Sequence, residues 1–399
     1  MPDGSSRLPR VVWLFGAVSL LNDFASEMIY PLLPAFVTGV LGGGAQALGA
    51  LDGAAEFTAA IVKLVAGRLA DRPERRGRLV VTGYFTAVVV RPVIALAGAA
   101  WQVIGLRVVD RIGKGLRTPP RDALIADATP AALRGRAFGL QRGLDHAGAV
   151  LGPLAAWWLL TAHAADLRRV IAASVVPGVA VLLLAVVAVK GGKERAGAVD
   201  APLPPSTASD RSLPPLTASA RRLPTPLLAI SFFYLLRMPD TLVILRSQQL
   251  GVAVATVPLL WAAVHVVRSS VSFVGGAWSD RFGPERTMGV GWVCYGVLAA
   301  AMGVATSTFQ AWALFLALGI VAGLTESPER AFVARLAGPR QGSGFGLYHG
   351  VTGFAALVGG LALGATYEAY GAAPAFFVSA ALGVPLMIAW PMLAGRRPA

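Results

Sequence analysis

Long apolar stretches divide this 399-residue chain, and they restrict its possible folds more than any other feature. Each is about 20 residues or longer, the length a helix needs to cross the hydrocarbon core of a bilayer. Only 14% of the residues are charged, against about 25% in an ordinary soluble domain. In lipid the backbone must satisfy its own hydrogen bonds, and the strict alternation of a membrane β-strand is absent. We therefore expect an all-α integral membrane protein.

Twelve such stretches follow one another along the chain. We predict transmembrane helices at 11–38, 46–69, 78–98, 101–126, 134–161, 169–190, 226–249, 254–278, 287–306, 308–334, 342–367 and 372–394. The first follows Arg7 and Arg10, as the apolar part of a signal peptide would. No small-residue cleavage site ends it, so we interpret it as a membrane helix.

The net charge of +14 is spread unevenly over the loops. Lys and Arg gather in the two termini and in the loops that follow even-numbered helices, whereas the opposite loops carry only Arg168 and Arg169. The positive-inside rule therefore places both termini in the cytoplasm, in a multi-pass protein of the inner (plasma) membrane. This topology explains the basic charge, so we expect the lipid bilayer as a partner and no nucleic acid.

A proline-rich segment separates two groups of six helices. It runs over 191–225, and seven prolines lie from Pro202 to Pro226. This composition buries too little apolar surface to fold, so we predict a flexible cytoplasmic linker. The expected domains are an N-terminal six-helix bundle at 1–190, the linker at 191–225 and a C-terminal six-helix bundle at 226–399.

The two groups share motifs at a nearly constant spacing. Gly67-Arg-Leu-Ala-Asp71-Arg72 corresponds to Gly276-Ala-Trp-Ser-Asp280-Arg281 (276 − 67 = 209). Pro120-Arg121-Asp122-Ala123 corresponds to Pro328-Glu329-Arg330-Ala331 (328 − 120 = 208), and Phe138-Gly-Leu140 to Phe345-Gly-Leu347 (345 − 138 = 207). Three matches in the same order indicate a duplicated unit and two pseudo-symmetric bundles.

These motifs resemble those of the major facilitator superfamily. The repeated Gly-x-x-x-Asp-Arg turn is similar to its signature loop, although Pro73-Glu74 stands where the first copy usually has a glycine. Arg107, followed by Gly113 and Gly115, is similar to its fourth-helix arginine segment. The stretch from Gly148 to Pro153 resembles a motif of bacterial drug/proton antiporters, with Ala155-Ala156 replacing its closing glycines. The resemblance covers nearly the whole chain and implies a monomeric secondary transporter with a central site between two rocking bundles.

The fourth predicted helix has a strongly basic face. A charge at the centre of a lone membrane helix costs about 2.5–3.5 kcal/mol, so this face must be paired or must border a water-filled pathway. An ion-pair ladder between helices and a substrate-binding role both stay open for each residue. At about 100° per residue, the following side chains project within an arc of about 140°: Arg107, Asp110, Arg111, Lys114, Arg117, Arg121 and Asp122.

Charges in the other helices extend this candidate pathway for substrate and protons. We hypothesise that Asp23 and Glu27, one turn apart in the first helix, pair with bases of the fourth and exchange partners during transport. Asp145 beside His146 is either a proton site or a buried pair, and Arg237 and Asp240 are close enough to neutralise each other. Asp52 and Glu56 form either a proton relay or an outer polar patch. The full set is Asp23, Glu27, Arg107, Asp110, Arg111, Lys114, Arg117, Asp145, His146, Arg237, Asp240, His265, Arg268 and Glu326.

The repeated motifs are candidates for gates. The pairs Arg121-Asp122 and Glu329-Arg330 have opposite charge order, so we expect them to bridge the two bundles near the cytoplasm. For the Asp-Arg turns, simple capping of the helix ends is the alternative. The candidate gating residues are Gly67, Asp71, Arg72, Arg121, Asp122, Gly276, Asp280, Arg281, Glu329 and Arg330. Glycine pairs at 139/143, 148/152, 346/350 and 360/364 predict close helix packing.

The sequence contains no phosphate-cradling loop, no nucleophile motif and no tight cluster of metal ligands. We therefore expect neither an enzyme nor an ATP-driven pump, and no metal or cofactor. The leading hypothesis is proton-coupled efflux of a small organic molecule by alternating access. Proton-coupled uptake of an organic anion, favoured by the basic fourth helix, is the alternative. A receptor that transports nothing is a third reading, and it would need an elaborated soluble loop.

Overall fold

The computed structural model describes residues 8–70, 72–129, 133–196, 225–337 and 341–394. Within these ranges every regular element is a helix, and each of the predicted ranges lies on one or more of them. The all-helical fold class is therefore confirmed for the described part of the chain.

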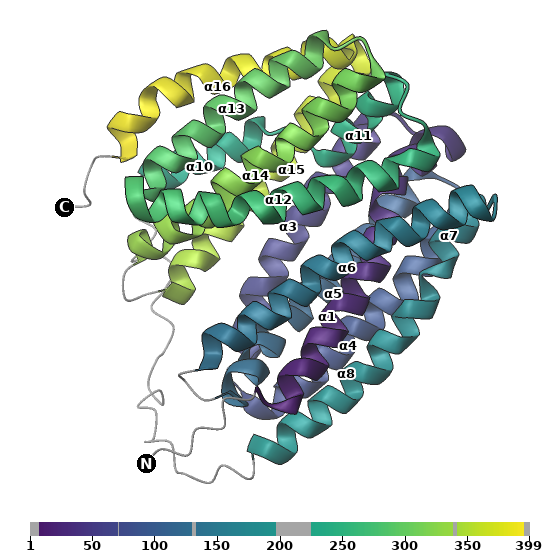
Figure 1. Ribbon diagram of the computed structural model, residues 1–399, viewed down its shortest axis with the longest axis vertical. Helices are drawn as coiled ribbons and strands as arrows, with labels where there is room; N and C mark the ends of the chain where they lie inside the picture. Colours follow the sequence, from purple (N-terminus) through teal and green to yellow (C-terminus); the bar gives the residue numbers. More distant parts are fainter. Residues whose placement is uncertain (1–7, 71, 130–132, 197–224, 338–340, 395–399) are drawn as a thin grey trace.

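The N-terminal helices lie alongside one another at the lower right of Figure 1. They are α1 (Arg10–Ile29), η1 (Tyr30–Leu32), α2 (Leu33–Ala35), η2 (Phe36–Val40), α3 (Ala45–Ala70), α4 (Pro73–Val93), η3 (Ile94–Leu96), α5 (Ala100–Asp127), α6 (Arg134–Ala162), α7 (Leu167–Ala173) and α8 (Val175–Ala196). Helix α1 packs against α6 and α8, and α5 packs against α3 and α4. The charged helix α5 is thus covered by neighbours on two sides.

The C-terminal helices occupy the upper left of the same view. They are α10 (Thr225–Leu236), α11 (Asp240–Gln249), η5 (Val254–Thr256), α12 (Val257–Phe282), α13 (Pro284–Val304), α14 (Thr308–Ala337), α15 (Gln341–Tyr370) and α16 (Ala372–Ala394). Helix α14 packs against α12 and α13, and α16 against α13. The two parts meet mainly where α3 packs on α15 and α6 on α12.

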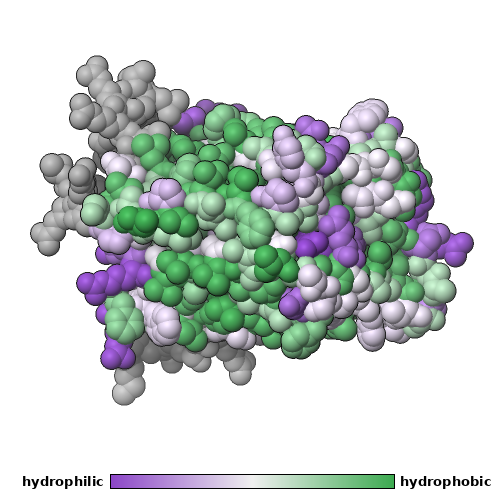
Figure 2. Space-filling model, turned by 90° about the horizontal axis from the view of Figure 1, so that it is seen from above, coloured by the Kyte–Doolittle hydropathy of each residue, from purple (hydrophilic) through white to green (hydrophobic). Residues whose placement is uncertain are grey.

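The surface of the molecule suits lipid. In the described ranges, nine helical segments are long and apolar enough to cross a membrane; α3, α5 and α6, which carry many of the interior charges, are not among them. Large apolar side chains such as Leu183 and Ile388 are 64% and 70% exposed. Figure 2 shows hydrophobic residues over much of the middle of one face, with hydrophilic ones mainly toward its two ends. This distribution is that of a multi-pass membrane protein.

Prolines interrupt two of the long helical segments. In the first, Pro31 and Pro34 cannot donate a backbone hydrogen bond, and α1 gives way to 3₁₀ and π turns. In the seventh, Pro239 precedes the first residue of α11, and Arg237 and Met238 belong to neither α10 nor α11. This second break leaves the N-terminus of α11 inside the molecule, where the N–H of the buried Thr241 finds its acceptor outside the helix.

Ion pairs recur in the two parts at the spacing of the sequence motifs. Arg76 at the start of α4 pairs with Asp127 at the end of α5, and Glu285 at the start of α13 pairs with Arg335 near the end of α14. The offsets (285 − 76 = 209 and 335 − 127 = 208) match those of the motifs, and the charges are reversed. The recurrence supports the duplication of one structural unit.

Glycines permit close approach at two helix contacts. A Cβ atom on Gly49 of α3 would lie 1.9 Å from the carbonyl oxygen of Gly360 on α15, and one on Gly148 of α6 would lie 2.1 Å from a carbonyl of α1. Close packing is thus confirmed for the pairs 148/152 and 360/364. The prediction is wrong for Gly139 and Gly143 in the described part of the chain, because a Cβ atom there would meet none of its atoms within 4 Å.

Candidate functional site

One carboxylate lies among three guanidinium groups in the N-terminal part. Arg91 of α4 donates from Nε to Oδ1 of Asp110 at 3.0 Å, and Arg107 donates to Oδ2 at 3.5 Å. Arg111 Nε lies 4.0 Å from the same Oδ2, beyond hydrogen-bond distance. These four residues, called the Asp110 cluster here, are all buried. Sequence reasoning missed Arg91, whose only signal is that it is a lone base in an apolar stretch.

Asn22 joins α1 to this cluster. Its backbone carbonyl accepts a hydrogen bond from Arg91 at 3.0 Å, and its side-chain oxygen accepts one from Arg117 at 3.2 Å. Arg117 also donates to the carbonyl of Gly83 and lies over the ring of Tyr84, 4.8 Å from its centroid. Neutral acceptors and an aromatic face therefore hold Arg117, rather than a carboxylate.

The carboxylates of α1 have other partners. Asp23 accepts a hydrogen bond from the side chain of Asn22 at 2.9 Å. Glu27 accepts one from Nε1 of Trp261 on α12 at 2.9 Å and lies 3.9 Å from Nε2 of His265. The hypothesised pairing of Asp23 and Glu27 with the bases of α5 is not seen in this structure. Glu27 instead links the N-terminal part to the C-terminal part.

Asp52 of α3 lies at the N-terminus of α11. Its oxygens accept hydrogen bonds from the hydroxyl of Tyr30 at 3.0 and 3.1 Å. Oδ2 also accepts from the backbone N–H and the hydroxyl of Thr241, at 3.1 and 2.8 Å. The unpaired amides and the dipole of a helix N-terminus stabilise a carboxylate in this position. The Asp52–Thr241 contact is therefore a second polar link between the two parts.

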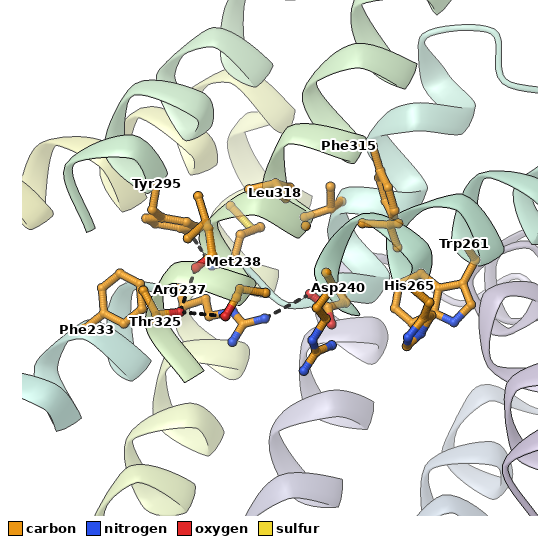
Figure 3. Close-up of a pocket in the computed structure, with 16 residues that line it drawn as sticks. Phe233, Arg237, Met238, Asp240, Trp261, His265, Tyr295, Phe315, Leu318 and Thr325 are labelled. Carbon is orange, nitrogen blue, oxygen red and sulfur yellow. Dashed lines mark hydrogen bonds and ion pairs between the residues drawn. The ribbon is translucent and has the colours of Figure 1, made fainter. Parts of the chain in front are cut away.

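A small pocket lies in the C-terminal part between α10, α11, α12 and α14, with a cavity volume of about 50 Å³ (Figure 3). Aromatic rings and several predicted pathway residues line it. These are Phe233, Trp261, Tyr295 and Phe315, together with Arg237, Asp240, His265 and Arg268. The pocket is thus apolar in its walls and charged at a few points, as small-molecule sites usually are.

Local ion pairs neutralise most of the charge in this pocket. Arg237 pairs with Asp240 at 3.6 Å, as their spacing predicts, and Arg268 pairs with Glu326 of α14. Among the described pocket residues, Nε2 of His265 is buried and has no hydrogen-bond partner. A ligand in this pocket would therefore meet aromatic rings and little net charge.

Glu329 of α14 is buried and has no basic partner among the described residues. Glu329 is 3% exposed, and its carboxylate accepts a hydrogen bond from the hydroxyl of Tyr348 on α15. The hydroxyl of Tyr234 lies 3.3 Å from that of Tyr348. No Lys, Arg or His of the described ranges forms an ion pair with Glu329. It differs in this respect from Glu326, one turn earlier on the same helix.

The expected bridge between the motifs of the fourth and tenth predicted helices is absent from this structure. Arg121 pairs with its own neighbour Asp122 at 2.9 Å, and neither contacts Glu329 or Arg330. The motif residues Gly67, Arg72, Gly276 and Arg281 lie near the ends of α3 and α12. Asp71 and the side chain of Asp280 lie outside the described residues.

Three predicted pathway residues have no polar side-chain contact in the described ranges. Lys114, Asp145 and His146 are partly buried, and none forms a side-chain hydrogen bond or an ion pair there. Asp145 and His146 therefore do not form a buried pair with each other in this structure. No group of three or more His, Cys, Asp or Glu side chains in the described part is arranged to hold a metal.

Comparison with known sequences assigns the family. The family model of the Major Facilitator Superfamily matches residues 15–267 and 227–399. An uncharacterized MFS-type transporter of Methanocaldococcus jannaschii is 27% identical over 371 residues, which cover 91% of this chain and 89% of the relative. The multidrug resistance protein MdtH of Photorhabdus laumondii is 32% identical over 142 residues, which cover 36% of this chain and 35% of the relative.

Solved structures share the fold. The nucleoside transporter NupG has a TM-score of 0.76 at 13% identity, and the match covers 98% of this chain and 100% of that one. A bacterial homolog of the human lysosomal transporter Spinster, in an inward-facing and unoccupied conformation, has a TM-score of 0.67 at 15% identity, with coverages of 96% and 94%. Such identities establish the fold alone. The family model, however, matches nearly the whole chain, and the protein therefore belongs to the Major Facilitator Superfamily, whose members are membrane transporters and not enzymes.

Proposed function

We propose that this protein is a secondary active transporter that moves a small organic molecule across the inner membrane in exchange for protons. Twelve spans would comprise the nine apolar segments together with α3, α5 and α6, whose charges face the interior. The bundles at 1–190 and 226–399, joined by a cytoplasmic linker at 191–225, would act together as one monomer. The partial similarity to a multidrug resistance protein favours outward transport.

Alternating access requires two bundles that separate at one end while they close at the other. In this structure the bundles are joined near the start of α3 by the approach of Gly49 to Gly360 and by the bonds from Thr241 to Asp52. The positive-inside rule puts this end outside and both termini in the cytoplasm. We infer that these contacts form an outer gate and that the structure represents a state closed to the outside.

The observation that carries proton coupling is the environment of Glu329. A coupling group must accept a proton in one state and release it in another, which a permanent ion pair would oppose. Glu329 is buried and contacts the hydroxyl of Tyr348, with Tyr234 next in line, whereas Glu326 is paired with Arg268. Its position on α14, close to the aromatic pocket, lets solute binding and proton binding influence each other.

Internal pH in proteoliposomes tests this proposal. Lipophilic cations, neutral drugs and organic anions are added in turn to purified wild type, Glu329→Gln and Asp127→Asn, the last being a peripheral carboxylate control. We expect a solute to drive a pH change in the wild type and the control but not in Glu329→Gln, which should still bind that solute. Folded wild type that binds a solute and never changes the pH would remove proton coupling. A pH change that persists in Glu329→Gln would indicate that another carboxylate, such as Asp145, is the proton-coupling group.

One observation favours a second function, proton-coupled uptake of an organic anion. The Asp110 cluster places three guanidinium groups around one carboxylate on the interior face of α5. An inward proton gradient separates the two functions. It should load an imported anion into proteoliposomes that hold the protein with its cytoplasmic side inside, and should empty them of an exported solute.

A further inference from the structure

The Asp110 cluster holds more positive charge than its carboxylate can neutralise. The guanidinium groups of Arg91, Arg107 and Arg111 share the two oxygens of Asp110, and Arg91 makes the closest contact. The Nε atoms of Arg107 and Arg111 are buried and have no hydrogen-bond partner in the described ranges. Native structures seldom leave a buried charged donor unpartnered unless a ligand, an ion or water completes it.

Two lysines extend this surplus charge toward α3. Lys114 follows Arg111 by three residues, about one helical turn along α5. Gly115 lets α5 approach α3 closely, because a Cβ atom there would lie 2.6 Å from Val62 and 3.2 Å from the backbone nitrogen of Lys63. Lys63 and Lys114 are partly buried, and neither ammonium group forms a hydrogen bond or an ion pair in the described part of the chain.

The carboxylates nearby form no ion pair with these bases in the described ranges, and they offset the surplus charge only in part. Glu27 is engaged by a tryptophan of α12, and Asp23 by the amide of its neighbour. Glu56 forms no ion pair with any described residue, and the charges that act on it most strongly are those of Arg111 and Lys63. Glu56 is also exposed, although α3 is packed between α5 and α15, so this side of α3 is not covered by other described residues.

Glu27 places the aromatic pocket next to this charge. Its carboxylate bonds to Trp261, which lines the pocket, and the charges that act on it include those of Arg107 and Lys114. The arginines of the pocket itself already have carboxylate partners. A single ligand that reaches both regions would therefore place its apolar part in the pocket and its negative end toward α5.

On the basis of the transport function proposed above, we propose that the solute is an amphipathic organic anion whose carboxylate or phosphate group binds Arg111, with Lys114 and Lys63 beside it. The planar guanidinium group of Arg111 can donate two parallel hydrogen bonds to either anion. The lysines add point charges, and the rings around Trp261 and Phe315 accept the apolar part of the solute.

Binding to the purified full-length protein tests this site. The probes are four compounds of similar size: phenylpropanoate, phenyl phosphate, phenylpropanamide and phenylpropylammonium. Isothermal titration compares the wild type with Arg111→Gln, Arg111→Lys and Lys114→Gln. Arg142→Gln is the matched control, because Arg142 is an exposed arginine of α6 without an ion pair to any described residue. Thermal unfolding and size-exclusion profiles confirm that each variant is folded.

We expect an anionic probe to bind the wild type and Arg142→Gln at least about ten-fold more tightly than the amide or the ammonium compound. Arg111→Gln should weaken anion binding by about ten-fold or more and leave the neutral probe unchanged, and Arg111→Lys should recover part of the loss. Lys114→Gln should weaken anion binding in the same direction, which keeps a test available if Arg111→Gln does not fold. The stronger of the two anionic probes then assigns a carboxylate or a phosphate ester.

Two results would overturn the anion site: folded wild type that binds neither anion, or anion binding that is unchanged in both Arg111→Gln and Lys114→Gln. The transport proposal can fail or stand separately. A proteoliposome pH change driven by a cation or a neutral drug alone would keep proton coupling and remove the anion site. Anion binding with no pH change for any solute would keep the site and remove proton coupling.

Discussion

Gly49 of α3 and Gly360 of α15 meet across the two bundles with no room for a side chain. A Cβ atom on Gly49 would lie 1.9 Å from the carbonyl oxygen of Gly360, whereas ordinary contact begins at 3.4 Å. The substitution Gly49→Ala must therefore lengthen this Cβ–oxygen distance by at least 1.5 Å (3.4 − 1.9 = 1.5) wherever the contact is closed, which forces the two helices apart. Backbone lies on the far side, so no side chain can rotate away to relieve the clash.

Over-packing a well-packed contact typically costs about 1–3 kcal/mol, and we take this range as the free-energy cost of the separation. It applies only to the state in which the proposed outer gate is closed. The gain in helix propensity from glycine to alanine, about 1 kcal/mol, is the same in both states and cancels. The closed-to-open equilibrium should thus shift toward opening by about 5- to 150-fold.

The alkylation rate of a cysteine at the gate measures this shift. Ala45, the first residue of α3, is 6% exposed, so Ala45→Cys should react slowly with an impermeant maleimide in a Cys294→Ser background. While open molecules remain a minority, the rate should rise in Gly49→Ala by the factor given above. Gly350→Ala on α15 is the control, because a Cβ atom there meets nothing within 4 Å, and its rate should not change.

An unchanged rate in folded Gly49→Ala would refute the reasoning, because the bundles would then not be held together at this contact. An equal rise in Gly350→Ala would refute it as well. That result would trace the effect to helix propensity rather than to the clash.

Three further predictions concern polar contacts. Asp110→Asn leaves the guanidinium groups of its cluster without an anion and should lower stability by about 3–5 kcal/mol in thermal unfolding, so a loss below about 1 kcal/mol would contradict the buried cluster. Thr241→Val removes one donor to Asp52 and should raise the labelling rate at the gate by about two- to twelve-fold, whereas an unchanged rate would show that this bond does not hold the gate closed. Glu285→Gln breaks a pair with Arg335, which is 55% exposed, and should cost less than about 1 kcal/mol; a loss as large as that of Asp110→Asn would contradict this.

The helices and the repeated plan could be predicted from the sequence because both are local or periodic properties. In lipid, an apolar stretch of this kind satisfies its backbone hydrogen bonds by forming a helix. The constant spacing of the motifs along the chain shows the duplication directly. The reversed pairs Arg76–Asp127 and Glu285–Arg335 lie at the same offsets as the motifs. Their charges were visible in the sequence, but their pairing needed the packing of α4 on α5.

The pair Arg237–Asp240 follows from its spacing, but the partners that join different helices could not be predicted. Whether Arg91 meets Asp110 depends on how far α4 is rotated about its own axis, which helical spacing does not encode. Glu27 was expected to face α5 and instead bonds to Trp261 across the two bundles. One unbroken helix was predicted at 226–249, whereas α10 ends at Leu236 and α11 begins at Asp240. Nothing in the sequence indicated that an amide at the start of α11 would meet a carboxylate of α3.

Paired distance measurements at both ends of the molecule test alternating access most directly. Spin labels at Thr38 and Ala373, near the start of α3, report one end. Labels at Arg72 and Arg281, the last residues of the repeated motifs, report the other. Pulsed electron paramagnetic resonance in nanodiscs follows both pairs while the pH is changed and a binding solute is added. We expect one distance to lengthen as the other shortens. Distances that stay fixed, or that lengthen together, in protein that demonstrably binds the solute would contradict transport by alternating access.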